Sequence, residues 1–379
     1  MYKFSKKHIQ FQKDITKIFA QFENTIDQST YDSYISELEK LKILGLLIPE
    51  KYGGYTIDFL SATLLIYELA KRNSSLAHVL SCHTFGFSFP INQFGSTHQK
   101  EKYLTKIVDH NCKGTLAITE PTGIMPSSIK LTAKGSDGFY VLNGNKCMIT
   151  NAVNSDFAIV LVKTNNIDSD TPTFNDFSLL IVDLKETDGI TIGVVEETMG
   201  MENVQISEIL FEDAKIPKSQ VLGEEGQAFK LLFKIFEYSR IINASVALGI
   251  AETAFNEGVR YAKQRMLNGK PLIINPIINQ SIARSQIDLK TINLLTFYNA
   301  SLIENTDESI YLNAAISKMC VTEKAKSICD SMLQIFGGYG YVKKYNIEKL
   351  YRDIRIHTIL GGSSEIILNT VVNEILKTN

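Results

Sequence analysis

The spacing of hydrophobic and polar positions divides the chain into three stretches, and the first is helical. Over residues 57–72, Leu60, Leu64 and Tyr67 recur at the spacing of one helix face, and Asp58 stands where an N-cap is expected. No strand-like alternation interrupts the pattern before residue 113. Residues 1–113 are therefore predicted to form an α-helical domain.

Between residues 114 and 222 the pattern changes to that of β-strands. Short apolar runs at residues 157–163 and 178–183 are typical of buried strands. Asn143 and Gly144 follow the apolar run at residues 139–142, which predicts a hairpin turn at this pair. This stretch is predicted to form a compact β-domain.

Helical spacing returns near residue 226 and continues to the end. Ile328, Met332 and Ile335 lie on one stripe of a predicted helix, and Gly337 and Gly338 are suited to end it. The order α, β, α predicts three domains with boundaries at 1–113, 114–222 and 223–379. We find no internal repeat or low-complexity tract.

Composition and charge narrow the class of protein. The 379 residues are 44% hydrophobic, enough for a globular protein with sizeable cores. A formal net charge of -2, without a dense Lys/Arg stretch, makes nucleic acid an unexpected partner. The first residues contain no continuous apolar run, so neither a signal peptide nor a membrane span is predicted. We expect a cytoplasmic protein.

Cysteine and histidine spacing predicts no metal site. The five cysteines form no C-x-x-C pair and are odd in number, which favours reduced, scattered thiols. His78, His83 and His98 are separated by five and fifteen residues, and these spacings do not place them on one helix face. We interpret these histidines as ordinary residues.

Three segments suit the binding of a cofactor or a substrate, and each also has a simpler structural explanation. The glycines from Gly337 to Gly340 either let backbone N–H groups approach a phosphate or ribose, or only end a helix. Hydroxyls at Thr119 and Thr150 stand beside predicted strand ends, where they bond a planar cofactor or close turns. Arg240 lies in an apolar helix, and a buried guanidinium needs an anionic partner, either a ligand or a structural carboxylate.

In chain order, these segments resemble the acyl-CoA dehydrogenase family over nearly the whole sequence. The N-terminal part has an Ile-Pro-Glu-x-Tyr-Gly-Gly motif, and the β-stretch has Leu-Ala-Ile-Thr-Glu-Pro and Met-Ile-Thr-Asn. The C-terminal part has Gln-Ile-Phe-Gly-Gly, Arg-Asp and Gly-Ser-Ser-Glu-Ile. The matching residues are 45–54, 68–70, 94–100, 116–121, 143–151, 211–217, 222–226, 265–270, 334–338, 352–353 and 362–366.

The resemblance implies the fold and the cofactor. The expected fold class is α+β and mostly α: an N-terminal helical domain, a β-barrel-like middle domain and a C-terminal four-helix bundle. FAD is the implied cofactor, bound in a homodimer or homotetramer, with the loop at Gln334 reaching the adenosine part of FAD in a neighbouring subunit. The implied FAD contacts are Thr119, Met148, Ile149, Thr150, Arg265, Gln334, Gly337, Gly338, Ser363, Ser364 and Glu365.

The resemblance also implies a reaction, but the usual base is missing. The family removes the proton α to a thioester carbonyl and transfers the β-hydrogen to the flavin as hydride. Gly361 stands at the common position of the catalytic glutamate, and Ser239 stands at the alternative position just before Arg240. Glu237 is the nearest carboxylate in sequence, although two residues along a helix turn through about 200°. Glu237 is our candidate for a displaced base.

Other departures affect the substrate. The loop at residues 122–126, which contains Met125, differs from the family pattern, and Met148 replaces the tryptophan that stacks on the flavin. Met125, Arg240 and Gly361 are the predicted substrate contacts. We hypothesise a thioester whose oxidation needs less help from a base, such as one tethered to an acyl carrier protein instead of CoA.

Three functions stay open at this point. The first is α,β-dehydrogenation of an acyl thioester, with a flavoprotein or oxygen as electron acceptor. The second is a flavin-dependent monooxygenase or oxidase on the same fold, which would not need the α-proton base. The third is a non-catalytic relative that keeps FAD or only the fold.

Overall fold

The computed structural model describes residues 4–23, 27–304 and 310–377, and its first domain is helical. Asp58 caps the third helix by accepting a hydrogen bond from the backbone N–H of Ser61 at 2.6 Å, which confirms the predicted N-cap. The six α-helices of this part are α1 (Lys6–Ile18), α2 (Gln28–Lys40), α3 (Phe59–Arg72), α4 (Ser74–His83), α5 (Phe89–Phe94) and α6 (Thr97–His110).

A curled seven-stranded sheet follows the helices. Its strands are β1 (Gly114–Ala117), β2 (Thr132–Ser136), β3 (Phe139–Thr150), β4 (Phe157–Lys163), β5 (Phe177–Asp183), β6 (Ile190–Ile192) and β7 (Ile206–Pro217). The hydrogen-bonded order is β1-β4-β2-β3-β7-β6, and β5 pairs with β4. The two predicted apolar runs are β4 and β5, buried along nearly their whole length. The sheet has a hydrophobic core of its own.

The predicted hairpin turn at Asn143 and Gly144 is wrong. Both residues lie inside β3, and the two-residue turn is at Asp137 and Gly138, between β2 and β3. The pairing of β3 with β7 shifts register between Leu142 and Gly144, and Gly144 has φ +136°. A Cβ on Gly144 would lie 2.9 Å from the Cα of Leu131. This glycine therefore serves a bulge and a close backbone approach, which local sequence does not distinguish from a turn.

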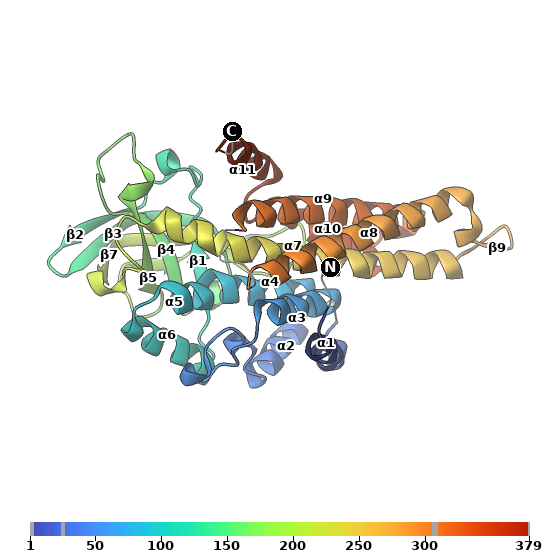
Figure 1. Ribbon diagram of the computed structural model, residues 1–379, viewed down its shortest axis with the longest axis horizontal. Coiled ribbons are helices and arrows are strands. Elements are labelled where there is room, and N and C mark those ends of the chain that lie inside the picture. The colour runs from blue at the N-terminus through green and yellow to red at the C-terminus, as the bar shows by residue number, and fades with distance from the viewer. Residues whose placement is uncertain (1–3, 24–26, 305–309, 378–379) are drawn as a thin grey trace.

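The C-terminal part is an elongated helical bundle, confirming the expected fold class. Its helices are α7 (Ala228–Gln264), α8 (Pro276–Leu302), α9 (Tyr311–Ile335), α10 (Asn346–Ile354) and α11 (Ser364–Lys377). The predicted stripe of Ile328, Met332 and Ile335 is buried in α9, and Gly337, with φ +58°, follows its end. Figure 1 shows the sheet at one end of the molecule and the small β8–β9 hairpin (Met266–Leu267 and Lys270–Pro271) at the other.

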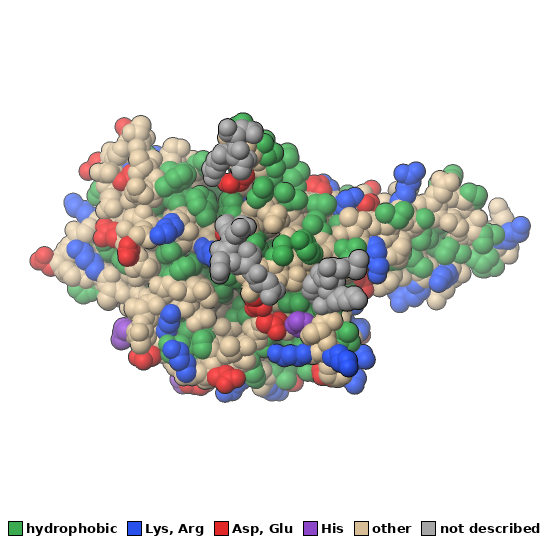
Figure 2. All heavy atoms as spheres, viewed as in Figure 1, with side chains coloured by type: hydrophobic (Ala, Val, Ile, Leu, Met, Phe, Trp, Pro, Cys, Tyr) green, Lys and Arg blue, Asp and Glu red, His purple; other side chains and the backbone are tan. Residues whose placement is uncertain are grey.

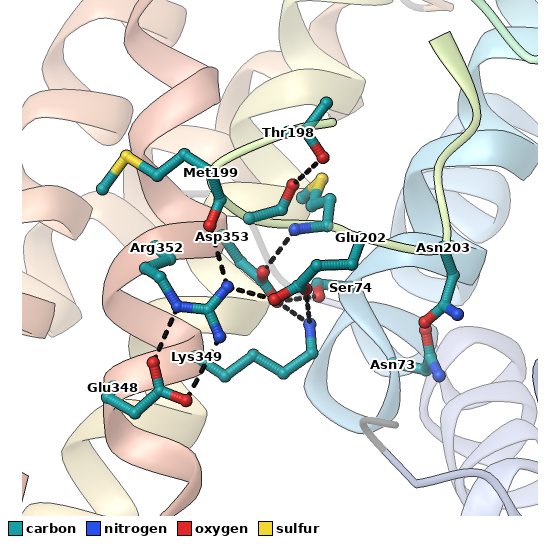
Figure 3. A network of polar contacts seen from close by, with 12 residues as sticks. Asn73, Ser74, Thr198, Met199, Glu202, Asn203, Glu348, Lys349, Arg352 and Asp353 are labelled. Carbon is teal, nitrogen blue, oxygen red and sulfur yellow. Dashed lines mark hydrogen bonds and ion pairs between the residues drawn. The ribbon is translucent and has the colours of Figure 1, made fainter. Parts of the chain in front are cut away.

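A buried polar network joins three parts of the chain. Asp353 of α10 accepts hydrogen bonds of 2.6 Å from the Ser74 hydroxyl, the Met201 backbone N–H and the Lys349 ammonium group (Figure 3). The neighbouring Arg352 pairs with Glu348 and Glu202. Because Ser74 begins α4 and Met201 follows the sheet's β6, this network fixes α10 against both the N-terminal and the middle part.

Candidate active site

Two segments of the sheet domain lie side by side where the sequence predicted flavin contacts. The Cys147 backbone N–H donates to the carbonyl oxygen of Thr119 at 2.9 Å. The Thr115 hydroxyl donates to the carbonyl oxygen of Thr150 at 2.8 Å. Ile149 is buried, whereas Thr119 and Thr150 are half-buried. The sheet therefore presents the two predicted hydroxyls from adjacent segments.

Met148 projects from this edge at a second irregularity of the sheet. The register of β3 against β7 shifts between Lys146 and Ile149, and Met148 lies in the left-handed region with φ +55°. Its side chain is 62% exposed. A bulge can redirect a side chain out of the sheet beside a functional site, and backbone strain often concentrates there. This apolar surface beside two hydroxyls fits one face of a planar ring such as a flavin.

A buried ion pair anchors the loop that follows Thr119. Lys146 and Glu120 are 2.8 Å apart with almost no exposure, and Glu120 also accepts hydrogen bonds from the backbone N–H groups of Lys130 and Leu131. Burial lowers the pKa of Lys146 to about 8, although Glu120 opposes the shift. The loop between these anchors carries Met125, a predicted substrate contact, with 54% exposure.

On the bundle side, Arg240 and Lys318 meet a turn made by Gly361 and Gly362. The Arg240 Nε donates weakly to the Gly361 carbonyl oxygen at 3.4 Å, and the Lys318 ammonium donates to the Gly362 carbonyl oxygen at 2.6 Å. Gly361 has φ +68°, and a Cβ there would lie 3.7 Å from the Asn243 amide nitrogen. Two buried cations therefore surround the position where the family carries its carboxylate.

A row of polar side chains connects this turn to the sheet. The Asn243 amide faces the carbonyl oxygens of His357 and Leu360 at 3.5 and 3.4 Å, and its oxygen accepts a hydrogen bond from the His357 Nδ1. The His357 ring stacks edge-on against His78, whose Nε2 is 3.6 Å from the Cys82 sulfur.

The row ends at the sheet and is uncharged. The Cys82 thiol lies near the Thr150 hydroxyl, which partly opposes the effect of burial, and burial raises the pKa of the thiol to about 11. Burial lowers the pKa of His78 to about 4; burial, His78 and Lys318 also lower that of His357. Both rings are therefore neutral near pH 7 and are weak bases. The sequence did not single out Asn243, His357 and Lys318, because no local pattern distinguishes them from other polar residues of their helices.

The two candidate base positions on α7 differ in burial. Ser239 is half-buried and Glu237 is buried. One carboxylate oxygen of Glu237 is 2.7 Å from the Lys234 ammonium nitrogen. Glu237 lies three residues before Arg240, so the two side chains leave α7 about 60° apart, one turn from each other. Glu237 is thus displaced toward the sheet end of α7 relative to Arg240.

The residues from Ser363 to Glu365 open α11 directly after the glycine turn. The Ser364 hydroxyl donates to Glu323 at 2.6 Å, which leaves Glu365 exposed in the first helical turn. Hydrogen bonding to backbone and to Ser363 lowers the pKa of Glu365. These predicted cofactor contacts lie beside the Arg240 and Lys318 pair.

The remaining predicted FAD contacts form a separate pocket. Arg265, Gln334, Gly337 and Gly338 line a cavity of about 530 Å³, in which the Arg265 guanidinium lies 5.4 Å from the centre of the Tyr339 ring. A Cβ on Gly337 or Gly338 would meet no atom within 4 Å, so open space lies before this backbone. Exposed N–H groups and a cation suit an anionic, ring-bearing ligand.

One chain does not bring the two groups of predicted FAD contacts together. Arg240 lies inside α7 and Arg265 caps its C-terminal end 25 positions later, so they are separated by about 37 Å at 1.5 Å per residue. Figure 1 shows the sheet and the β8–β9 tip at opposite ends of the molecule. An FAD molecule contacting both groups would require two copies of the chain.

The described residues offer neither a metal site nor a membrane span. No group of three or more His, Cys, Asp or Glu in residues 4–23, 27–304 and 310–377 could hold a metal ion. Within the same ranges no helix is both long and apolar enough to cross a bilayer.

Comparison with known proteins agrees with this architecture. Profiles of the acyl-CoA dehydrogenase N-terminal, middle and C-terminal domains match residues 8–111, 115–214 and 226–376. A Bacillus subtilis acyl-CoA dehydrogenase is 33% identical, covering 88% of this chain and 86% of its own. The short-chain specific acyl-CoA dehydrogenase of Megasphaera elsdenii is 35% identical, covering 90% and 89%.

A solved structure extends the agreement to three dimensions. The butyryl-CoA dehydrogenase of Megasphaera elsdenii superposes with a TM-score of 0.90 and 31% identity, covering 99% of this chain and 100% of the other. All three domains and their order are shared. The chain therefore belongs to the acyl-CoA dehydrogenase family, whose members are flavoprotein oxidoreductases that act on CH–CH groups.

Proposed function

We propose that this protein binds FAD and oxidises the α,β-bond of an acyl thioester. The observation that carries the proposal is the row of polar side chains Asn243, His357, His78 and Cys82. We call it the polar row; it runs from the Gly361 turn to Thr150. It joins the segment proposed for the flavin to the segment proposed for the substrate, across all three parts of the fold. A planar cofactor and a thioester would meet along this row.

Each group of residues has a proposed task. FAD, when bound, supplies the hydride acceptor. Thr119, Ile149 and Thr150 hold the edge of its ring, and Met148 covers a face. Glu237 takes the α-proton of the substrate. Arg240 and Gly361 contact the substrate, together with Met125 from the loop anchored by the ion pair of Lys146 and Glu120.

We further propose that each FAD site is completed by a second copy of the chain, in a homodimer or a homotetramer. The separation of Arg240 from Arg265 along one helix supports this arrangement. Apolar side chains exposed on the bundle also support it: Ile277 of α8 is 78% exposed, and Leu376 of α11 is 68% exposed. Figure 2 shows hydrophobic side chains scattered over the bundle.

Mixed oligomers test this arrangement. Met148→Glu places a carboxylate where the flavin would stack, and Arg265→Glu reverses a charge in the other pocket, so each variant alone is expected to lose most FAD. When both chains are coexpressed, random pairing should restore FAD in about a quarter of the sites, because half of the dimers contain one intact site of two. FAD absorbance per chain measures the recovery.

Both substituted side chains are exposed, so the variants should fold, and circular dichroism checks this. The matched control coexpresses two copies of Arg265→Glu carrying different tags, which should stay without FAD. If the Met148→Glu and Arg265→Glu mixture also stays without FAD, each site is completed within one chain.

Relatives suggest the partners. A caffeyl-CoA reductase-Etf complex subunit of Acetobacterium woodii is 33% identical over 90% of this chain, and a structure titled as an electron transferring flavoprotein of Acidaminococcus fermentans superposes with a TM-score of 0.91 at 27% identity. We therefore propose an electron-transferring flavoprotein as acceptor and CoA as the thioester carrier. A prolyl acyl carrier protein oxidase at 22% identity shares the fold, and a carrier-protein substrate stays the alternative.

Anaerobic flavin reduction tests the proposed reaction. The purified holoprotein is mixed with CoA thioesters and carrier-bound thioesters, and bleaching of oxidised flavin is followed. Bleaching with a thioester is the expected result. Bound FAD without bleaching by any thioester would contradict the proposal. Oxygen consumption with a reductant would then identify the monooxygenase or oxidase, and its absence would favour a non-catalytic relative.

A further inference from the structure

Arg240 is a buried cation whose charge has no partner in the described structure. The residue is 3% exposed, and its Nη1 atom is buried without any hydrogen-bond acceptor. Its guanidinium lies 4.6 Å from the centre of the Tyr311 ring and 5.5 Å from that of Phe236, so aromatic rings cover its faces. Among the residues that the structure describes, only the weak contact to the Gly361 carbonyl oxygen engages the edge of the guanidinium.

A second buried cation adds to the positive charge beside the glycine turn. Lys318 is fully buried, and its hydrogen bond goes to a backbone carbonyl oxygen, that of Gly362. Burial and the charge of Arg240 lower the pKa of Lys318 to about 8. Two cations thus approach one glycine turn, whereas the family resemblance places a carboxylate at Gly361.

Nearby carboxylates in the described ranges form no ion pair with these two cations, although the charges of Glu323 and Glu365 partly oppose the lowering of the Lys318 pKa. Glu237 lies 2.7 Å from the Lys234 ammonium nitrogen, and Glu323 pairs with Lys326 and accepts from Ser364. Glu365 is exposed. None of them forms an ion pair with Arg240 or Lys318 within 4 Å.

An arginine cannot relieve this imbalance by losing its proton, because its pKa is too high. A buried, unpaired charge is strongly destabilising, because it loses its hydration and gains no counter-charge. An orphaned, buried donor beside a substrate position therefore indicates a ligand that supplies the missing acceptor.

We propose that the substrate's acyl group carries a carboxylate, which pairs with Arg240 at the Gly361 turn. The inference rests on the proposed function and adds the chemical class of its substrate. The glycines have no side chain against Arg240: a Cβ on Gly361 would lie in ordinary contact with the Asn243 amide at 3.7 Å, and one on Gly362 would contact the Arg240 Nη2, Ile366 and Ile367 at 3.7 Å.

The polar row agrees with a short, polar acyl group. Asn243, His357, His78 and Cys82 extend from the turn toward Thr150, and each is polar. A long alkyl chain placed along these groups would bury apolar surface against hydrogen-bonding atoms. A carboxyacyl group of a few carbons places its charge against Arg240 and needs no deep apolar channel.

Matched thioesters test the proposal directly. Succinyl-, glutaryl- and adipyl-CoA are compared with butyryl-, pentanoyl- and hexanoyl-CoA, which have the same carbon counts without the terminal carboxylate. Dissociation constants for the oxidised holoprotein are measured anaerobically by calorimetry. At least one carboxyacyl-CoA should bind about 10- to 100-fold more tightly than its partner, as a charge-assisted hydrogen bond predicts. Equal affinities in all three pairs would overturn the proposal.

Variants assign the preference to Arg240. Arg240→Gln should remove the preference, so that the ratio between the affinities for a carboxyacyl-CoA and for its matched alkyl thioester falls to about one. Arg240→Lys keeps the positive charge and should retain part of the preference for carboxyacyl-CoA. This variant keeps the test possible if Arg240→Gln fails to fold. The control is Arg72→Gln, the same loss of charge at an exposed arginine at the end of α3, and should leave the preference unchanged. If Arg240→Gln weakens both classes alike, the proposal is wrong.

Installing the missing carboxylate provides an independent test. Gly361→Glu would give Arg240 an internal partner, so the ratio between the affinities for a carboxyacyl-CoA and for its matched alkyl thioester should fall to about one. Gly361 has a left-handed backbone, so circular dichroism checks that the variant folds. An unchanged preference in a folded Gly361→Glu protein would contradict the proposal.

These results separate the two proposals. If carboxyacyl-CoA binds preferentially but no thioester bleaches the flavin, the substrate class stands and the proposed dehydrogenation fails. If alkyl thioesters bleach the flavin and show no weaker binding, the dehydrogenation stands and the Arg240 assignment fails.

Discussion

Glu237→Gln is expected to slow the reduction of flavin by a reactive thioester about 10²- to 10⁴-fold, the usual contribution of a positioned base. Glutamine keeps the size of the side chain but cannot accept the α-proton. Glu237 is buried one turn from Arg240, and the family resemblance implies that Gly361 and Ser239 stand at the two usual positions of the base. Stopped-flow absorbance of the flavin under anaerobic conditions measures the rate.

A second variant tests whether a loss of rate comes from the missing carboxylate or from a change in the surrounding structure. Lys234→Ala removes the ammonium group 2.7 Å from the Glu237 carboxylate and leaves the carboxylate in place. If Glu237 is the base, this variant should retain the rate within about tenfold, because the carboxylate is still present. Exchange of the substrate α-hydrogen in D₂O, followed by NMR, should be lost only in Glu237→Gln. Undiminished exchange in that variant would exclude Glu237 as the base.

Asp353→Ala is expected to destabilise the protein by about 3–5 kcal/mol, because it leaves a buried lysine without its main partner. Asp353 is fully buried and accepts three hydrogen bonds of 2.6 Å, from Ser74, Met201 and Lys349. The network in Figure 3 thus loses its central acceptor at the junction of α4, α10 and the loop after β6. A lower melting temperature and an earlier urea midpoint measure the effect.

Asp330→Ala is the matched control, since Asp330 is exposed on α9. A surface substitution of this kind should change stability by no more than about 0.5 kcal/mol. The loss of stability in Asp353→Asn should lie between those of the two alanine variants. The amide oxygen can still accept hydrogen bonds, whereas the negative charge is lost. Equal melting temperatures for Asp353→Ala and Asp330→Ala would show that the network contributes no net stability.

The sequence predicted those elements whose signals are local. Helical spacing and a capping aspartate located α3, and apolar runs located β4 and β5, because period and caps depend on neighbours in the chain. The prediction of a hairpin turn at Asn143 was wrong because it, too, used only neighbours in the chain. An Asn-Gly pair suits a turn and a bulge alike, and pairing with β7 decided between them.

The candidate site was predictable only in part. Motifs identified Thr119, Thr150, Arg240 and Gly361, but no pattern joined them. Asn243 and His357 are 114 positions apart in sequence, and their hydrogen bond forms because α7 packs beneath the turn before α11. The sequence likewise showed that Arg240 needs an anion, without showing whether the chain supplies one.

By itself, the sequence determined the order of helical and β-domains and the resemblance to the family, which implies that Gly361 and Ser239 stand at the two usual positions of the carboxylate. Those features follow from residue identity and short-range spacing. Only the tertiary structure decided that the predicted FAD contacts separate into two places and that the Nη1 atom of Arg240 is buried without an acceptor. Both depend on burial and long-range packing, because the environment of a charge is set by every segment that surrounds it.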